Sequence, residues 1–358
     1  MRVFFYHTQD IKFIHKEWSE GRFPAHFLYG ATHLPQEGID VVFYKYIDRH
    51  VPRFLRMIYN AWQILTCHEK IDAVYATRHN GIEIIILLRA LGLYRKPIVC
   101  WHHQPVENSG NPLKERIARF FYRGIDHMFF FSDYLKNRSL ASGRITTSGT
   151  EQCAWGADMD FYNRLMNNNP CTNHEGFIST GKENRDMPTL VEAFAGTPDQ
   201  HLDLFSTADS GGVNYEQVFS TTSIPSNVTV NINHGKKHLM NELAHEIWTH
   251  KAICICCKET NYTVGLTTLV EALAFGLPVI ISKNPNQPFD ASEEGCGISV
   301  PYGDTDGWRK AIRFIADNPD EAERMGRRAH EMSEQTYNIS HTAHIIAEAL
   351  KKVNNDKA

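Results

Sequence analysis

The chain has 358 residues, more than one hydrophobic core usually organises, so the sequence predicts two domains. Hydrophobic residues make up 42% of the chain and charged residues 22%, as in soluble globular proteins. The formal net charge of −4 argues against a nucleic-acid-binding surface, which needs a basic face.

The sequence also favours a cytoplasmic protein. No apolar run reaches the roughly 18 residues that cross a bilayer, and no secretory signal precedes the first predicted strand. The eight cysteines are scattered rather than paired in a motif. Cys254, Cys256 and Cys257 fall in a predicted buried strand, where they are expected to serve as small apolar residues.

Strands and helices alternate along the N-terminal half. Short apolar runs predict strands at residues 1–6, 39–46, 73–76, 97–101 and 126–131. Amphipathic spacing predicts helices at 24–37, 52–67, 82–91 and 112–122, with a polar loop at 7–23. Such alternation is typical of a doubly wound parallel sheet, whose ligands bind beyond the carboxyl ends of the strands. The residues expected at those ends are His7, Gln9, Arg78, His102 and His103.

A second α/β series follows a polar, asparagine-rich stretch at 163–175, which we interpret as a linker. Strands are predicted at 177–180, 202–206, 228–232, 252–257, 279–281 and 297–301. Helices are predicted at 188–194, 238–249, 308–316, 321–337 and 340–353. The predicted domains are therefore 1–162 and 176–340, with a terminal helix in 341–358 that packs back on the first domain.

The most informative stretch is 265–281, which predicts a glycine turn, a helix and a buried strand. Gly265 precedes a helical pattern, and Gly276 followed by Pro278 ends it. A helix that starts at a glycine offers unpaired backbone N–H groups and a partial positive charge, which suit phosphate. Thr267 and Thr268 add hydroxyl donors, and Glu271 is placed to accept hydrogen bonds from a sugar hydroxyl.

The layout resembles a GT-B glycosyltransferase, closest to the large glycosyltransferase family 4. Four segments carry the resemblance: 156–161 (GADMDF), 179–194 (STGKENRDMPTLVEAF), 265–280 (GLTTLVEALAFGLPVI), and 295–304 together with 325–329. It implies two Rossmann-like, doubly wound parallel-sheet domains that face each other across a cleft. The N-terminal domain would bind the acceptor, and the C-terminal domain would bind the nucleotide sugar.

By that resemblance Glu271 would hold the ribose of the donor, and Lys182 and Arg185 would neutralise the diphosphate leaving group. Gly181, Gly265, Thr267 and Thr268 would line the donor site. The family carries two glutamates eight positions apart; Glu271 matches the second, and this chain has Thr263 where the first would stand. Glu259 in the same loop is the candidate replacement. Alternatively, the chain resembles a Gly-x-x-Thr-x-x-Glu pattern of other GT-B enzymes that manage without the first glutamate. The alternative for Lys182 and Arg185 is a solvated loop, and for Glu271 a pairing with the helix N-terminus.

His103 matches the family's active-site histidine by its spacing from Pro97, and His102 is the competitor. A neutral imidazole there would hydrogen-bond the reacting sugar or take the acceptor's proton. No Asp-x-Asp triplet stands at a strand end, so the expected mechanism uses neither a metal nor a cofactor; the nucleoside-diphosphate sugar is the substrate.

Two helices of the first half are basic. Arg49, Arg53 and Arg56 lie on or near one of them, and Lys114, Arg116 and Arg119 on the other. Both could contact an anionic membrane surface, which would suit a lipid-linked acceptor, or could simply be solvated helix faces.

The sequence thus predicts a retaining hexosyltransferase that moves a sugar from a UDP- or GDP-type donor to a hydroxyl of a glycan or lipid-linked acceptor, as in polysaccharide biosynthesis. Two alternatives remain open at this stage. One is a nucleotide-sugar epimerase of the same fold. The other is a non-catalytic sugar-nucleotide-binding protein, suggested by the missing first glutamate.

Overall fold

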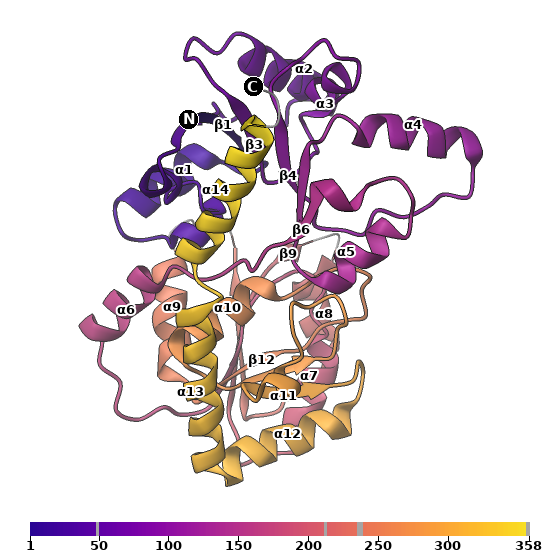
Figure 1. The fold of residues 1–358 in the computed structure, drawn as a ribbon. Coiled ribbons are helices and arrows are strands. Elements are labelled where there is room, and N and C mark those ends of the chain that lie inside the picture. The colour runs from indigo at the N-terminus through magenta and orange to yellow at the C-terminus, as the bar shows by residue number, and fades with distance from the viewer. Residues whose placement is uncertain (48–49, 211–212, 235–238, 356–358) are drawn as a thin grey trace. The chain divides into compact units, whose positions relative to one another are not determined.

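The computed structural model describes residues 1–47, 50–210, 213–234 and 239–355. The chain divides into two compact units (Figure 1). Unit 1 comprises Met1–Gly156 together with the terminal helix α14 (Ile339–Asn355), and unit 2 comprises Ala157–Asn338. Arg49 and the predicted helix start at His238 lie outside the described residues.

Unit 1 is built on a six-stranded parallel sheet in the order β2-β1-β3-β4-β5-β6. The strands are β1 (Arg2–Tyr6), β2 (Asp40–Phe43), β3 (Ala73–Ala76), β4 (Ile98–Trp101), β5 (His127–Phe130) and β6 (Thr150–Gln152). The central strands β3, β4 and β5 are buried along their whole length, as expected for a parallel sheet covered on both faces.

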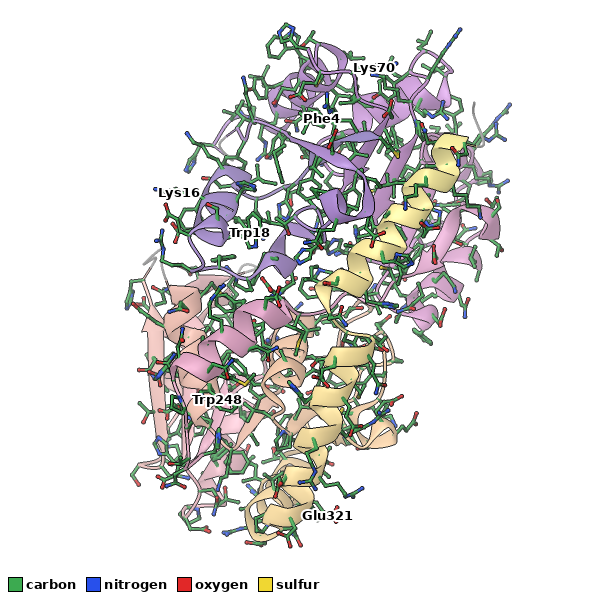
Figure 2. All side chains as sticks on the ribbon, turned by 60° about the vertical axis from the view of Figure 1, so that its left-hand side comes forward. Phe4, Lys16, Trp18, Lys70, Trp248 and Glu321 are labelled. Atoms are coloured by element: carbon green, nitrogen blue, oxygen red, sulfur yellow. The ribbon has the colours of Figure 1, made fainter. Side chains whose placement is uncertain are left out.

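The helices of unit 1 agree with the sequence prediction except near the N-terminus. They are α1 (Ile11–Ser19), α2 (Arg53–Leu65), α3 (Glu83–Ala90), α4 (Pro112–Tyr122) and α5 (Asp133–Leu140), and the Ser132 side chain caps α5. Helix α1, with Lys16 and Trp18 labelled in Figure 2, lies inside the predicted polar loop 7–23. It was missed because its apolar stripe is short, although the Asp10 side chain caps it.

The predicted helix at 24–37 was wrong. Two short 3₁₀ helices, η1 (Ala25–Leu28) and η2 (Leu34–Glu37), take its place, and a third, η3 (Thr147–Gly149), precedes β6. Tyr29 and Gly30 between the first two adopt positive φ values of 49° and 78°. A regular α-helix cannot contain left-handed residues, so the segment turns at this point.

Unit 2 has a second six-stranded parallel sheet, in the order β11-β8-β7-β12-β13-β14. Its strands are β7 (Phe177–Ser179), β8 (Leu202–Thr207), β11 (Val228–Asn233), β12 (Ala252–Ile255), β13 (Val279–Ser282) and β14 (Gly297–Val300). A short hairpin, β9 (Asp209–Ser210) with β10 (Val213–Asn214), precedes α8 and was not predicted. The helices are α6 (Met159–Asn168), α7 (Met187–Ala195), α8 (Tyr215–Thr221), α9 (Leu239–Thr249), α10 (Leu266–Phe275), α11 (Ala291–Glu294), α12 (Thr305–Asp317) and α13 (Pro319–Gln335).

The boundary between the units differs from the predicted one. Residues 157–162 were expected in the first domain and 163–175 in a linker, but α6 covers much of both and packs against α9 and α10 of unit 2. Trp248 of α9, labelled in Figure 2, stacks on Phe275 with ring centroids 5.8 Å apart and donates its indole N–H to the Asn169 carbonyl at 2.8 Å. These contacts make α6 part of the unit 2 core.

Each sheet has one place where strand order reverses, and this is where such folds bind ligands. In unit 2 the reversal lies between β7 and β12, because β8 and β11 extend to one side and β13 and β14 to the other. In unit 1 it lies between β1 and β3. Within the described residues, no helix has the length and apolarity needed to cross a membrane.

Candidate active site

Helix α10 begins at the reversal point of unit 2. Gly265 stands at its N-terminus with a φ of 81°, and a Cβ there would lie 2.6 Å from Cγ2 of Ile255 on β12. Only glycine tolerates both the left-handed backbone and this approach. The helix is buried except at Thr267, and its first-turn N–H groups cannot be satisfied within the helix itself. The structure therefore has the glycine-started helix end that the sequence predicted; phosphate binding there stays a prediction.

Arg185 lies beside this helix end. Its side chain is buried and donates to the carbonyls of Thr180 (3.1 Å) and Glu183 (3.2 Å). It also donates to the Thr268 hydroxyl (3.2 Å) and to Sγ of Cys257 (3.4 Å), and burial raises the pKa of that thiol. All four acceptors are uncharged, so the guanidinium charge and the positive end of α10 stand side by side. An anion bound there would be stabilised by both.

Gly181 and Lys182 lie, like Arg185, in the loop between β7 and α7. Gly181 has a φ of 105°, and a Cβ there would fall 2.2 Å from Nη2 of Arg185, so a side chain cannot be accommodated. The Lys182 side chain is exposed, while its backbone carbonyl accepts a 2.6 Å hydrogen bond from the Tyr215 hydroxyl. The structure thus brings Gly181 and Arg185 to the start of α10 and fixes the backbone of Lys182 close by.

Glu271 lies one turn further along α10 and is buried. Its carboxyl group lies near the hydroxyl of Tyr162, which comes from α6. Burial raises the pKa of Glu271 to about 8, although the Tyr162 hydroxyl and the charge of Arg185 both act to lower it. The carboxyl group therefore ionises only near neutral pH or above, unless a bound ligand supplies further donors.

We predict that Glu271→Gln makes the stability of the protein less dependent on pH. The carboxyl group holds its proton in the folded state up to about pH 8 but loses it near 4.5 when unfolded. Between these values the unfolded state binds fewer protons, so the free energy of unfolding of the wild type falls as pH rises. Between pH 5.5 and 7.5 the variant should gain up to about 2.7 kcal/mol relative to wild type. Chemical denaturation at both pH values measures this, with the exposed Glu192→Gln as control; parallel curves for Glu271→Gln and wild type would contradict the assignment.

The other predicted donor residues differ in their surroundings. Thr268 is buried and its hydroxyl also contacts that of Thr180 at 3.3 Å, whereas Thr267 is partly exposed. Glu259 is exposed in the loop between β12 and α10. Thr263, at the position of the family's first glutamate, donates to the Asn286 carbonyl at 2.7 Å. A role for Glu259 in place of that glutamate remains a prediction.

His103 follows β4 in unit 1 and is held in one orientation. Its Nε2 lies 2.8 Å from the Thr77 carbonyl, so Nε2 carries the proton, and Nδ1 faces a guanidinium nitrogen of Arg78 at 3.4 Å. The ring packs edge-on against Phe131 with centroids 5.0 Å apart. Burial, followed by the charge of Arg78, holds the pKa of His103 well below its usual 6.5, so the imidazole is neutral at physiological pH.

His102 points to the other face of the sheet, as alternate residues of a strand do. Its Nδ1 lies 2.7 Å from the Gln104 carbonyl and its Nε2 3.1 Å from the Tyr122 hydroxyl, and its ring stacks on His79. Both ring nitrogens of each histidine thus have a partner within unit 1. The contact of His103 Nδ1 with Arg78, at 3.4 Å, is the longest of the four, which favours His103 over His102 for chemistry.

Sequence reasoning missed two tyrosines of the donor half. Tyr162 lies near the carboxyl group of Glu271 and lowers its pKa. The Tyr215 hydroxyl both donates to the Lys182 carbonyl and accepts from the backbone N–H of Arg185 at 3.3 Å. Tyr162 was placed with the first domain, and Tyr215 lay between predicted elements. In the sequence, only the apolar residues near Tyr162 indicated that its side chain is buried. No sequence signal indicated that it lies near Glu271.

Part of the chain matches a known family by sequence. Residues 233–332 match the family model described as glycosyl transferases group 1. The matched segment contains Gly265, Thr268 and Glu271, whereas Lys182, Arg185 and His103 lie outside it. No curated protein matches the sequence.

Solved structures match nearly the whole chain. The Anabaena protein HepE, in complex with UDP, is 14% identical with a TM-score of 0.66, and the match covers 98% of this chain and 100% of HepE. The sucrose-phosphate synthase of Thermosynechococcus elongatus is 14% identical with a TM-score of 0.72, covering 99% of each chain. The alpha,alpha-trehalose 6-phosphate synthase of Burkholderia multivorans is 11% identical with a TM-score of 0.73, covering 100% of this chain and 99% of that one.

The chain has the GT-B fold. The segment that matches the family model lies in unit 2 and includes the start of α10. The Arg185 side chain, from outside that segment, lies next to the same helix start. The family match and the shared fold together support glycosyl transfer.

Proposed function

We propose that this GT-B chain is a retaining glycosyltransferase that uses a UDP- or GDP-type sugar as donor. In the reaction, the bond between the anomeric carbon and the diphosphate oxygen breaks. A hydroxyl oxygen of a glycan or lipid-linked acceptor takes the place of that oxygen. The nucleoside diphosphate leaves, and the acceptor hydroxyl loses its proton.

The donor is assigned to unit 2. The proposal rests on the buried Arg185 guanidinium, which donates to four uncharged acceptors and lies adjacent to the positive end of α10. This arrangement is suited to a diphosphate. Lys182, an exposed residue of the same loop as Arg185, would add an ammonium group. Glu271 would accept hydrogen bonds from the ribose hydroxyls. Hydrogen bonds donated by the ribose hydroxyls would also favour the ionised form of its carboxyl group.

The same groups stabilise the leaving diphosphate as it gains charge, which is usually the largest electrostatic contribution to catalysis. With Lys182, Arg185 and the helix end in place, the proposed mechanism requires no metal ion. The acceptor is assigned to unit 1, where His103 presents a neutral imidazole. Because its Nε2–H is bonded to the Thr77 carbonyl, Nδ1 is the atom that would accept a proton or a hydrogen bond, in exchange for its 3.4 Å contact with Arg78.

Two further observations support the proposal. HepE, which shares the fold, was solved with UDP, and separately with UDP-glucose. All eight cysteines are free thiols, which suits a reducing compartment such as the cytoplasm, where we place the reaction.

We predict that UDP or GDP raises the melting temperature of the protein by several degrees at saturating concentration. A ligand at about 100 times its Kd stabilises the folded state by about 2.7 kcal/mol, which corresponds to several degrees for units of this size. The measurement is a thermal-shift series with UDP, GDP, ADP and the corresponding monophosphates. The monophosphates should shift the temperature less, because one phosphate fewer reaches Arg185. Equal shifts for mono- and diphosphates, or none for any nucleotide, would contradict the assignment of the diphosphate site.

A further inference from the structure

Helix α2 of unit 1 is oriented with an apolar stripe toward solvent. Leu55, Ile58, Trp62 and Leu65 recur at helical spacing and are between 43% and 57% exposed. In a surface helix such a stripe normally faces the core. Leaving a large apolar side chain uncovered forgoes about 1.5–3 kcal/mol compared with burying it. An exposed apolar stripe of this size is typical of a surface that binds a membrane or another protein.

Polar contacts on the opposite side of α2 fix this orientation. Asn60 and Gln63 are buried there. The Asn60 amide donates to the Gly81 carbonyl at 3.0 Å, and the Gln63 amide pairs with both backbone groups of Lys45, at 2.8 Å and 3.0 Å. Turning the helix to bury its apolar stripe would break all three bonds and leave polar groups unsatisfied in the interior. The stripe is therefore a stable feature of the surface.

The neighbouring helices also carry exposed apolar side chains. Helix α3 packs against both α2 and α4 (Figure 1), and Gly124 after α4 approaches the Ile86 carbonyl so closely that a Cβ would meet it at 2.0 Å. Ten of the twelve large hydrophobic side chains that are exposed in the described part of the chain lie between residues 54 and 117. We use the name α2–α4 face for the exposed large apolar residues of these helices together with Leu91, which follows α3: Phe54, Leu55, Ile58, Trp62, Leu65, Leu87, Leu91, Leu113 and Ile117.

The charges beside this face are mostly positive. Lys114, Arg116 and Arg119 of α4 are exposed, whereas Glu115 is buried and paired with Arg144. The other acidic residue of these helices, Glu83, is paired with Arg53 at 2.7 Å. Exposed cations thus flank the apolar residues, although the whole chain carries a net charge of −4.

We propose that the α2–α4 face binds the surface of an anionic lipid bilayer. Exposed leucine, isoleucine and tryptophan side chains would enter the boundary between headgroups and acyl chains, and the α4 cations would contact anionic headgroups. The helices would lie in the plane of the membrane surface. A second copy of this chain is a less suitable occupant, because it would bring the same cations opposite one another. Vesicle binding requires no donor or acceptor, so it can be tested apart from the proposed transfer reaction.

The test is co-sedimentation of the full chain with vesicles of phosphatidylcholine alone or mixed with phosphatidylglycerol. We expect binding to the mixed vesicles that weakens with added salt. Arg116→Gln with Arg119→Gln should weaken it by about 25-fold, taking about fivefold for each cation. Ile58→Ser with Trp62→Ser should weaken it by at least about tenfold.

The matched control is Arg324→Gln with Arg327→Gln, which removes two exposed cations from α13 of unit 2 and should leave binding unchanged. Because all the substituted side chains are exposed, circular dichroism should show folded protein in every case. Equal binding by all variants, or no binding to anionic vesicles, would overturn the proposal. So would a wild-type dimer that dissociates in the Ile58→Ser, Trp62→Ser variant, since a second copy would then occupy the face.

Discussion

Replacing Glu271 by alanine is expected to lower kcat/KM for the sugar-nucleotide donor by at least about a hundredfold. The carboxyl group is buried on α10, next to Tyr162 and under the influence of the Arg185 charge. Hydrogen bonds from ribose hydroxyls to a carboxylate contribute about 1.5–3 kcal/mol each, so the loss of two accounts for the expected decrease. The measurement is initial rates of nucleoside diphosphate release with the donor at limiting concentration.

Two further variants separate a binding role from a structural one. Tyr162→Phe removes the hydroxyl that lies near Glu271 and should cause a smaller loss, because the carboxyl group remains. Glu192→Gln, on the exposed side of α7, should have no effect. If Glu271→Ala stays folded and retains wild-type kcat/KM, Glu271 does not contact the donor, and pairing with the helix N-terminus becomes its better explanation.

Replacing Lys182 by alanine should lower kcat by about 10²–10³, the usual effect of removing one donor that stabilises charge developing in a transition state. The side chain is exposed, and the backbone carbonyl that positions the loop remains bonded to Tyr215. The melting temperature should therefore stay unchanged. Lys310→Ala, an exposed lysine on α12, is the matched control and should retain full activity.

Arg185→Lys should lower both activity and stability, and so differs from Lys182→Ala. A lysine keeps the charge, but it cannot reproduce the bonds of the guanidinium to Thr180, Glu183 and Thr268. Single-turnover rates together with melting temperatures distinguish the two variants. A Lys182→Ala enzyme with unchanged kcat would show that the loop is only solvated, which was the alternative drawn from the sequence.

The sequence predicted the parallel sheets and α10 well because their signals are local. Short β-branched runs mark buried strands, and glycine before and after a helical pattern marks the ends of α10. The segment 24–37 failed because its apolar spacing suggested a helix, while the left-handed conformations of Tyr29 and Gly30 depend on the fold around them. Helix α1 was not predicted, because one capping aspartate and an apolar stripe within only nine residues give a weak sequence signal.

The site was predictable in its residue types but not in its contacts. Gly265 and Glu271 stood out by their place in a strand–turn–helix pattern. The contact between Glu271 and Tyr162, however, joins residues more than a hundred positions apart, and only the packing of α6 on α10 creates it. Likewise, the outward apolar stripe of α2 depends on the hydrogen bonds of Asn60 and Gln63 to distant backbone, which no periodicity reveals.

Glycosyl transfer itself is tested by product analysis after incubation with UDP- and GDP-sugars. Each incubation is run with and without hydroxyl acceptors of the glycan and glycolipid classes. We predict acceptor-dependent transfer with release of the nucleoside diphosphate and retained anomeric configuration, lost in both Glu271→Ala and His103→Ala. Epimerised sugar nucleotide formed without any acceptor would contradict glycosyl transfer and identify an epimerase. Tight donor binding without turnover across the acceptor panel would point instead to a sugar-nucleotide-binding protein.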